Sequence, residues 1–270
     1  MQKLYVGTKS NRELQLIQAL DFAKPGDTIV LMPGNYFTPS EPNIFEIEKD
    51  VTIVGKTYDC DDVKIFGSFF IKKGASLTIE NLTVDYTRDK FNTVMMYDND
   101  HFTAKNVHIK HSVDDSWNPI YAQNSTLSLT NSTISSCNNE TQSLNVENCQ
   151  LYLENNWMDA IYLKSSQCLI KDTTVNVSVT LDYVSTLDFV NLHVNASNSL
   201  DRDEFYVFDD SRVVGKNLYF SSKKPHICVC QSSFTNDVFI DGLEKVTWHF
   251  DEQSNVKADD VTPFTNGLDM

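Results

Sequence analysis

The chain has 270 residues, with 22 Lys or Arg against 37 Asp or Glu, so its formal net charge is −15. A chain of this length can bury a full core as one all-β domain. The acidic balance argues against nucleic acid and against anionic membrane surfaces as the main partner. It also makes a strongly anionic polymer an awkward substrate, because few cations could gather around it: only four arginines occur, Arg12, Arg88, Arg202 and Arg212.

The first residues, MQKLYVGTKSNRELQ, contain no apolar leader segment. No stretch of the chain approaches the roughly 18 apolar residues of a membrane-spanning helix, so we expect a soluble protein. If Met1 is the natural start, the sequence predicts a cytoplasmic location. A trimmed start would leave secretion open.

The stretch SNRELQLIQALDFAKPGD predicts one helix, over residues 10–24. Ser10 and Glu13 form a capping-box pattern, and Pro25-Gly26 ends the run. The apolar residues fall along one helical face, with Leu14, Ile17 and Leu20 in line and Leu16 and Ala23 beside them. An amphipathic helix ahead of the first strand would close the open end of a stack of repeats.

A short pattern, apolar-x-apolar-x-Asn-apolar-x-apolar, recurs at roughly 24-residue spacing. Its copies are LTIENLTV at Asn81, FTAKNVHI at Asn106, LSLTNSTI at Asn131, LNVENCQL at Asn148, CLIKDTTV at Asp172, LDFVNLHV at Asn191 and VVGKNLYF at Asn217. Two weaker copies place Gly55 and Gly242 in the same slot. Each copy reads as a strand, a corner residue that accepts a left-handed backbone, and a second strand. Turn asparagines in ordinary hairpins are the alternative, but hairpin meanders rarely keep one residue type at one phase.

Stacked repeats of this kind form parallel sheets with like positions about 4.8 Å apart. The asparagines would then form a ladder whose side chains hydrogen-bond from one coil to the next. The phase also predicts an inward row that includes Ile79, Ala104 and Leu129, and a second row that includes Val84 and Ile109. Cys168 occupies an inward slot, so we expect it to be a core residue.

The stretch ELQLIQALDFAKPGDTIVLMPGNY, followed by VTIVGK and the asparagine ladder, resembles the opening of right-handed parallel β-helix proteins of the pectin lyase-like superfamily. The resemblance implies an all-β solenoid of about ten coils over residues 1–250, followed by a polar C-terminal tail over 251–270. Members are mostly carbohydrate-active lyases, hydrolases, esterases and epimerases, alongside tailspikes and non-enzymatic repeat modules. The paired aspartates of polygalacturonases, the calcium and RxPxxR motifs of pectate lyases and the QDTLY-like run of pectin methylesterases are absent. No catalytic residue of the family is therefore carried over to this chain.

Two aromatic segments, DDSWNPIY and NNWMDAIY, provide the candidate substrate-binding residues: Trp117, Tyr121, Trp157 and Tyr162. The repeat assignment places the two tryptophans two coils apart, about 10 Å along the axis, around the short 17-residue step from Asn131 to Asn148. Aromatic walls with nearby carboxylates suit the binding of sugars. The alternative is that both tryptophans pack as covers over neighbouring turns.

Acidic residues near this strip are weak catalytic candidates: Asp98, Asp114, Asp115, Asp159 and Asp182. Two of them at a suitable separation could act as acid and base, or as acid and nucleophile. Arg202, inside the cluster DRDE, is a further weak candidate, because a lyase or epimerase needs a cation beside its carboxylates. For the aspartates, solvated surface positions are the favoured alternative, and for the cluster around Arg202 a surface salt-bridge network is the simpler explanation.

We expect no metal site and no cofactor. The six cysteines show no paired CxxC spacing, and Cys228 and Cys230 share one side of a strand-like run, which is poor geometry for a mutual disulfide. Free thiols, mostly buried, are favoured over disulfides.

His108 and His111 face opposite sides of an extended run. Calcium could sit among the acidic turns, but no EF-hand-like loop or regular Asp repeat supports it.

Two function classes follow from these observations. The first is a carbohydrate-binding or carbohydrate-processing β-helix protein; if it is an enzyme, it would be a polysaccharide lyase, glycoside hydrolase or epimerase. The second is a non-catalytic β-helix scaffold that binds a protein partner or assembles through its flat sheet. We expect neither nucleic acid nor membrane as a partner.

Overall fold

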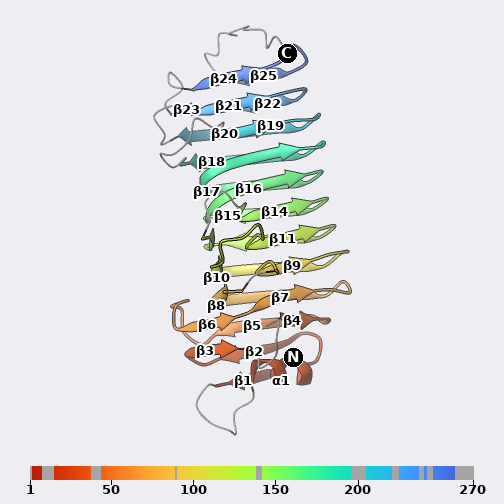
Figure 1. Cartoon of the computed structure of the whole chain (residues 1–270), viewed down its shortest axis with the longest axis vertical. Helices are drawn as coiled ribbons and strands as arrows, with labels where there is room; N and C mark the ends of the chain where they lie inside the picture. Colours follow the sequence, from red (N-terminus) through yellow and green to blue (C-terminus); the bar gives the residue numbers. More distant parts are fainter. Residues whose placement is uncertain are drawn as a thin grey trace. The chain divides into compact units, whose positions relative to one another are not determined.

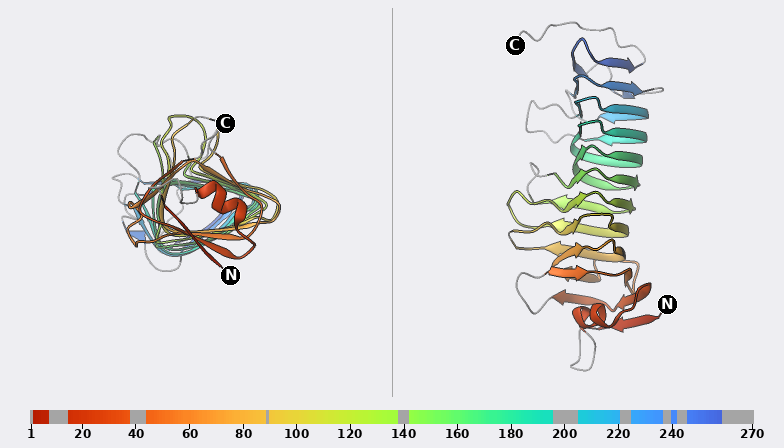
Figure 2. Two further views of the ribbon diagram at one scale, coloured as in Figure 1. Left: turned by 90° about the horizontal axis from the view of Figure 1, so that it is seen from below. Right: turned by 90° about the vertical axis from the view of Figure 1, so that its right-hand side faces the viewer.

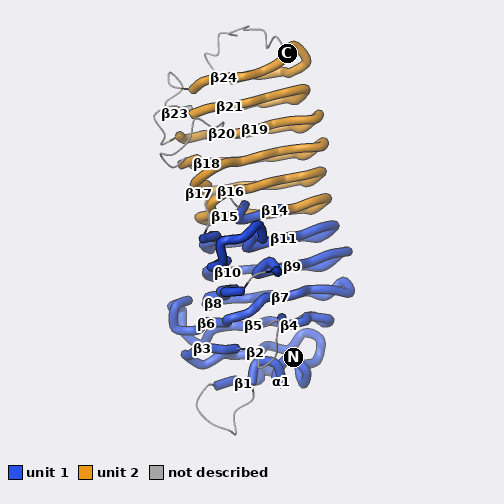
Figure 3. Tube along the Cα trace, viewed as in Figure 1, with its two compact units in different colours: residues 1–145 blue, residues 146–270 orange. Residues whose placement is uncertain are grey.

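The computed structural model describes residues 2–7, 15–37, 44–88, 90–137, 142–195, 205–220, 225–236, 240–241 and 246–258. Contacts divide the chain into two compact units, residues 1–145 and 146–270 (Figure 3). In each unit short strands pair in parallel with strands one turn later, so both units are parallel β-solenoids (Figure 1). The chain makes about nine turns, close to the predicted ten. No helix in the described ranges is both long and apolar enough to cross a membrane.

Unit 1 is built of three parallel sheets, named here I, II and III in the order in which the chain visits them. Sheet I contains β1 (Lys3–Val6), β2 (Asp27–Leu31), β5 (Val51–Gly55), β12 (Thr126–Thr130) and the first halves of β8 (Ser76–Tyr86) and β10 (His101–His111). Sheet II contains β3 (Gly34–Phe37), β6 (Val63–Phe66), β13 (Thr133–Ser136) and the second halves of β8 and β10. Sheet III contains β4 (Ile44–Ile47), β7 (Ser68–Ile71), β9 (Val94–Met96) and β11 (Ile120–Gln123). The boundary between the units falls within β14 (Leu144–Glu147).

Unit 2 has the same plan, and four of its strands continue around a corner without interruption, as β8 and β10 do in unit 1. Sheet I contains β15 (Gln150–Glu154), β22 (Ser233–Asn236), β25 (Asn255–Ala258) and the first parts of β17 (Gln167–Asp182), β18 (Thr186–Val194) and β20 (Arg212–Phe220). Sheet II contains β23 (Ile240–Asp241), the start of β16 (Trp157–Lys164) and the later parts of β17, β18 and β20. Sheet III contains the ends of β16 and β17, with β19 (Phe205–Val207), β21 (His226–Val229) and β24 (Thr247–Phe250).

The core of each unit follows from the alternation of side chains along a strand. The predicted inward residues Ile79, Ala104 and Leu129 are fully buried. Cys168 is buried in unit 2, as predicted, and this burial raises the pKa of its thiol. None of the six cysteines forms a disulfide in the structure, and only Cys149 and Cys168 are buried, so the prediction of mostly buried thiols is wrong.

The corner between sheets I and II carries the predicted asparagine ladder. Asn106 donates from Nδ2 to Asn81 Oδ1 at 2.9 Å in unit 1. In unit 2, Asn191 donates to Asp172 Oδ1 at 2.6 Å, and Asn217 donates to Asn191 Oδ1 at 2.7 Å. All five residues have a positive φ, between 47° and 62°. Asparagine and aspartate accept the left-handed backbone that the corner requires. Their side chains also form hydrogen bonds between neighbouring coils.

The assignment of Asn148 to this ladder is wrong. Strand β15 pairs with β17 so that Glu154 faces Lys171, which makes Asn155 the partner of Asp172 at the corner. Asn148 lies one corner earlier, between sheets III and I. Both residues have a φ of 52°, and both end an apolar-x-apolar-x-Asn run, so the pattern alone does not separate the two corners.

Gly55 lies in the ladder slot for a different reason from the one predicted. Its φ is not left-handed, but a Cβ at this position would overlap the backbone carbonyl of Asn81. Glycine is required there because two coils approach closely. Gly242, the other predicted glycine corner, lies outside the described residues.

A helix is present as predicted, but α1 (Leu16–Phe22) is shorter than the predicted 10–24: Gln15 is its N-cap and Ala23 its C-cap. It lies across the end of the unit 1 coils (Figure 2, left). Its first turn is held by Gln15 N–H, which donates to Gln18 Oε1 at 3.2 Å. The predicted capping box of Ser10 and Glu13 lies outside the described residues. The buried face of α1 consists of Leu16, Ala19 and Leu20, so the predicted line through Ile17 and Leu20 is wrong in part: Ile17 is only half-buried. Burying a leucine side chain contributes about 1.5–3 kcal/mol, so this face stabilises the docking of the helix on the coil end.

The predicted C-terminal tail begins too early. Strand β25 pairs in register with β22, with Ser233 opposite Asn255 and Phe234 opposite Val256. The solenoid therefore continues to Ala258, beyond the predicted boundary at 250. Residues 259–270 lie outside the described part of the chain, and the assignment of residues 1–250 to one domain stays a prediction.

Candidate functional site

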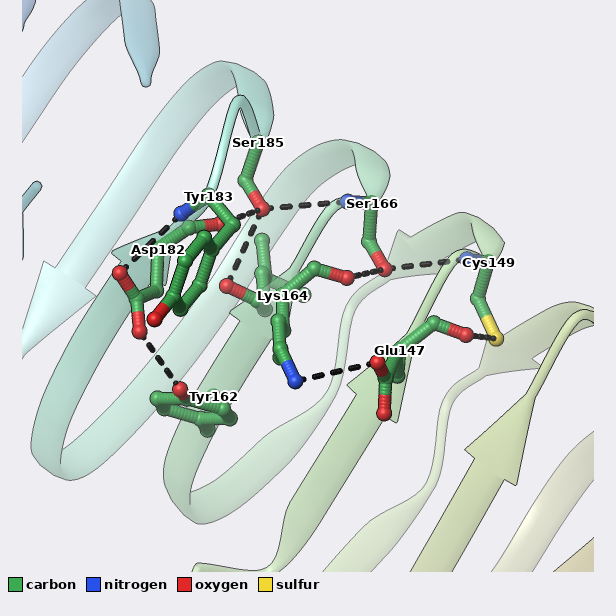
Figure 4. A network of polar contacts seen from close by, with 9 residues as sticks. Glu147, Cys149, Tyr162, Lys164, Ser166, Asp182, Tyr183 and Ser185 are labelled. Atoms are coloured by element: carbon green, nitrogen blue, oxygen red, sulfur yellow. Dashed lines mark hydrogen bonds and ion pairs between the residues drawn. The ribbon is translucent and has the colours of Figure 1, made fainter. Parts of the chain in front are cut away.

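A cluster of polar and aromatic side chains lies on the outer face of sheet III in unit 2, where β16 and β17 end (Figure 4). We call Glu147, Tyr162, Lys164, Asp182 and Tyr183 the sheet III cluster. Tyr162 and Lys164 point outward, because they alternate with Ile161 and Leu163, which are fully buried. In the parallel register Lys164 lies opposite Asp182, so side chains from neighbouring coils meet.

Hydrogen bonds hold the acidic half of the cluster. Tyr162 donates its hydroxyl to Asp182 Oδ2 at 2.8 Å, and the Tyr183 N–H donates to Asp182 Oδ1 at 3.1 Å. Burial and the hydrogen bond to Asp182 raise the pKa of the Tyr162 hydroxyl. Tyr162 is therefore a protonated donor at neutral pH, and it fixes the direction of the carboxylate.

The other half of the cluster combines a cation with an exposed ring. Lys164 Nζ lies 3.1 Å from Glu147 Oε1 and 5.4 Å from the centre of the Tyr183 ring. The hydrogen bond to Glu147 raises the pKa of Lys164, so this side chain stays charged. Tyr183 is 52 % exposed and has a φ of 48°. The ring is thus presented to solvent beside a positive charge and two carboxylates.

A ladder of buried hydroxyl groups supports the cluster from the corner behind it. The Cys149 N–H donates to Ser166 Oγ at 3.0 Å, and the Ser166 N–H donates to Ser185 Oγ at 3.1 Å (Figure 4). The Ser185 N–H donates in turn to Ser211 Oγ at 3.1 Å, and the Ser211 N–H to Ser232 Oγ at 3.1 Å. Our sequence analysis missed this ladder. Its signal is a serine directly before each sheet I strand, in the runs SSQ, VST, DSR and QSS.

Of the predicted site residues, Tyr162 and Asp182 are brought into direct contact, as described above. Trp157 is 37 % exposed but lies on sheet II, in a row with Thr174 and His193. Tyr162 lies on sheet III, opposite Thr180. The two aromatic residues therefore belong to different sheets of unit 2.

Trp117 and Tyr121 lie in unit 1. Trp117 is 40 % exposed, and its N–H donates to Asp115 Oδ1 at 2.9 Å. The same oxygen lies 2.8 Å from Nε2 of the buried His111, so the turn that carries Trp117 is anchored to the core. Tyr121 lies on sheet III, with its ring centre 5.7 Å from that of Tyr97.

The remaining predicted charged residues include Asp98, Asp159 and Arg202. Asp98 is exposed and accepts a 3.3 Å hydrogen bond from Asn124 Nδ2. Asp159 is buried, with 4 % of its surface exposed. Arg202 lies outside the described residues. Among the residues that the structure does describe, no three His, Cys, Asp or Glu side chains converge in a geometry that could hold a metal ion.

No protein-family model matches the chain. No curated protein matches it either. Among solved structures, a mutant of the PL6 family alginate lyase AlyGC matches 95 % of this chain with 14 % identity and a TM-score of 0.45. The chain spans only 40 % of the length of that lyase.

Two further solved structures match at similar levels. A pectin methylesterase from Aspergillus niger matches 94 % of this chain and 85 % of its own, with 11 % identity and a TM-score of 0.38. An alginate lyase from Paenibacillus sp. str. FPU-7 matches 94 % of this chain and 99 % of its own, with 12 % identity and a TM-score of 0.32. The fold assignment rests on the strand pairing of the chain itself, which is that of a parallel β-solenoid with an asparagine ladder, as predicted.

Proposed function

We propose that this chain is a carbohydrate-binding β-helix protein and that unit 2 holds an oligosaccharide on the sheet III cluster. The observation that carries the proposal is the exposed ring of Tyr183, placed beside Lys164 and the Tyr162–Asp182 pair. A sugar ring offers an apolar C–H face and a rim of hydroxyl groups. The cluster offers an aromatic face and a rim of charged donors and acceptors.

Each residue has a distinct role in this arrangement. The Tyr183 ring would stack on the apolar face of a pyranose. Asp182 accepts hydrogen bonds from sugar hydroxyls through lone pairs that Tyr162 does not use, because a carboxylate has about four acceptor positions. Lys164 donates to a ring or hydroxyl oxygen. Its contact with Glu147 keeps the ammonium group close to the Tyr183 ring.

We propose binding rather than turnover as the primary activity. Both carboxylates of the cluster are engaged within the protein, Asp182 by Tyr162 and Tyr183, and Glu147 by Lys164. The negative charge of the chain favours neutral over acidic oligosaccharides. Lyase, hydrolase or epimerase activity at Asp182 is a separate proposal. Its test is an assay for turnover of the ligand that the array identifies.

A glycan array on the purified chain, with and without calcium, tests the proposal. The ligand found there is then titrated calorimetrically into Tyr183→Ala and Asp182→Asn, and we expect each substitution to weaken binding at least about tenfold. Tyr152→Ala is the matched control, because Tyr152 is also an exposed tyrosine of unit 2 but lies on sheet I and contacts Glu154. Equal losses in all three variants, or no loss in the first two, would contradict the assignment.

The predicted tryptophans offer a second test of where the sugar lies. If Trp117 or Trp157 belongs to the binding surface, Trp117→Ala or Trp157→Ala abolishes binding and leaves the melting temperature nearly unchanged. A large loss of stability instead assigns the tryptophan to packing over its turn. Quenching of tryptophan fluorescence by the same ligand gives an independent readout.

A second candidate function is assembly through the outer face of sheet I in unit 2. Tyr152, Leu169 and Val190 are all more than a third exposed on this face, and Tyr152 pairs with Leu169 in register. Exposed apolar residues at sheet positions are typical of interaction surfaces. Sedimentation at increasing protein concentration tests self-association, and Leu169→Glu should abolish any that is found.

A further inference from the structure

We propose that Cys228, Cys230 and His249 form a zinc-binding site on the outer face of sheet III in unit 2. The site is separate from the sheet III cluster and does not depend on the proposed sugar binding. It rests on the directions of the side chains along β21 and on the register between β21 and β24.

The alternation of β21 puts both thiols on the outside. Ile227 and Val229 are fully buried, so Cys228 and Cys230 both point away from the core. Parallel pairing continues past the end of the strand, because the Cys230 N–H donates to the Val207 carbonyl at 2.9 Å. A regular backbone thus holds both cysteines, and neither thiol is buried.

The two sulfur atoms lean toward one another and lie 3.7 Å apart. In a tetrahedral zinc site the Zn–S distance is about 2.3 Å, which places two thiolate sulfurs roughly 3.8 Å apart. In the structure the two thiols form an S–H···S contact at this distance, and one zinc ion could bridge the pair as thiolates with little change in their separation. A disulfide would need the sulfurs to approach to about 2.05 Å.

A third ligand is available on the neighbouring strand. In the parallel register His249 lies directly opposite Cys228. Its side chain is exposed, so it can turn about its side-chain bonds toward the thiols. His226 lies on the same outer face, with its ring centre 5.9 Å from that of His249. Two thiolates and an imidazole are ligands that Zn²⁺ prefers, and a water molecule or His226 would complete the tetrahedron.

The thiol pair is the preformed part of the site. Among the described residues no three such ligands already converge in metal-binding geometry, so His249 must move to complete the coordination. The spacing Cys-x-Cys lies outside the paired CxxC pattern, which is why the sequence led us to expect no metal. The strand geometry, and not the spacing, brings the two sulfurs together.

The experiment titrates the reduced full chain with Co²⁺ as a spectroscopic probe and then with Zn²⁺ as a competitor. We expect one equivalent of Co²⁺ to produce a sulfur-to-cobalt charge-transfer band, and Zn²⁺ to displace it. Cys228→Ser and Cys230→Ser should each lose the band, and His249→Ala should weaken binding at least about tenfold. The matched control is Cys137→Ser, which removes an exposed thiol of unit 1 and should change nothing.

Alkylation followed by mass spectrometry keeps the proposal testable even if a variant fails to fold. In the unmodified chain Zn²⁺ should protect Cys228 and Cys230 from alkylation and leave Cys137 reactive. The absence of a charge-transfer band in the wild-type chain would overturn the site. Equal protection of Cys137 would do the same, because it would indicate unspecific binding to thiols.

Discussion

The hydroxyl of Tyr162 and the carboxylate of Asp182, 20 residues apart in sequence, lie 2.8 Å from each other on neighbouring strands of sheet III. Parallel stacking of coils creates this contact: Tyr162 lies opposite Thr180, and Asp182 is the next outward residue on the same strand. The hydrogen bond fixes the carboxylate beside the exposed Tyr183 ring. A rigid array of polar groups around an aromatic surface is the arrangement that sugar recognition needs.

The asparagine ladder should contribute measurably to stability. Asn191 makes two ladder hydrogen bonds and adopts a φ of 54°. Asn191→Ala loses both bonds and strains the backbone, so we expect the free energy of unfolding to fall by about 2–3 kcal/mol. Asn191→Gly loses the bonds but relieves the strain, and should cost about 1–2 kcal/mol. Urea unfolding measures both; equal stability of wild type and Asn191→Ala would rule out the ladder as a stabilising feature.

The serine ladder gives a second stability prediction. Ser185 Oγ is fully buried, accepts from the Ser166 N–H at 3.1 Å and donates to the Asp182 carbonyl at 2.6 Å. Ser185→Ala leaves a buried N–H without this acceptor, so the free energy of unfolding should fall by about 1–3 kcal/mol. Ser178→Ala, on the half-buried outer face of the same unit, should change it by less than about 0.5 kcal/mol. Similar values for the two variants in urea unfolding would argue against the ladder.

Phe189 and Gly215 form a large–small pair in the core of unit 2. They lie opposite each other in register, and a Cβ on Gly215 would overlap the Phe189 ring. Gly215→Ala should therefore lower the free energy of unfolding by about 1–3 kcal/mol. Adding Phe189→Leu makes room for the new methyl group, so the double variant should lose less than the sum of the single losses. Strict additivity in a double-mutant cycle would show that the pair does not interact.

The N-terminal end of unit 1 should depend on pH through Asp27. Its buried carboxylate accepts hydrogen bonds from the Gln2 N–H at 2.7 Å and the Lys24 N–H at 3.0 Å, and these bonds lower its pKa. A carboxyl group whose pKa is lowered by folding stabilises the protein above its unfolded pKa, about 3.9, and this contribution is lost as the pH falls through the folded value.

Asp27→Asn should therefore be less stable than the wild type at pH 7, and the gap should narrow on acidification below about pH 4. Urea unfolding at a series of pH values measures the gap. Asp21→Asn, an exposed substitution on α1, is the control and should leave the pH profile unchanged. A gap that is constant with pH would exclude the ionised carboxylate as its cause.

The repeat and the core could be predicted from the sequence because strand alternation and corner chemistry are local signals. Ile79, Ala104 and Leu129 are buried as the phase requires, and Asn106 bonds to Asn81. The misplaced Asn148 shows the limit of such signals. Two corners of one coil carried the same short pattern, and only the pairing of β15 with β17 separates them.

The candidate site was predictable only in part. Tyr162 and Asp182 were selected from the sequence, but their partners Glu147, Lys164 and Tyr183 were not. Contacts between coils depend on strand register, and the coils of unit 2 differ in length, so equal sequence spacing does not identify neighbours. The sequence does contain one usable signal. Glu147 lies two residues before Cys149, and Lys164 lies two residues before Ser166, whose hydroxyl accepts from the Cys149 N–H.

The most direct test of the central claim is a calorimetric titration of the purified chain with the ligand that a glycan array identifies. The claim is that this ligand binds at the sheet III cluster of unit 2. We expect the wild-type chain to bind a neutral oligosaccharide, and Tyr183→Ala and Asp182→Asn to weaken that binding at least about tenfold, while Tyr152→Ala does not. Silence across neutral and acidic glycans would contradict the account and favour the protein-binding scaffold. Binding that survives both substitutions would place the sugar elsewhere on the solenoid.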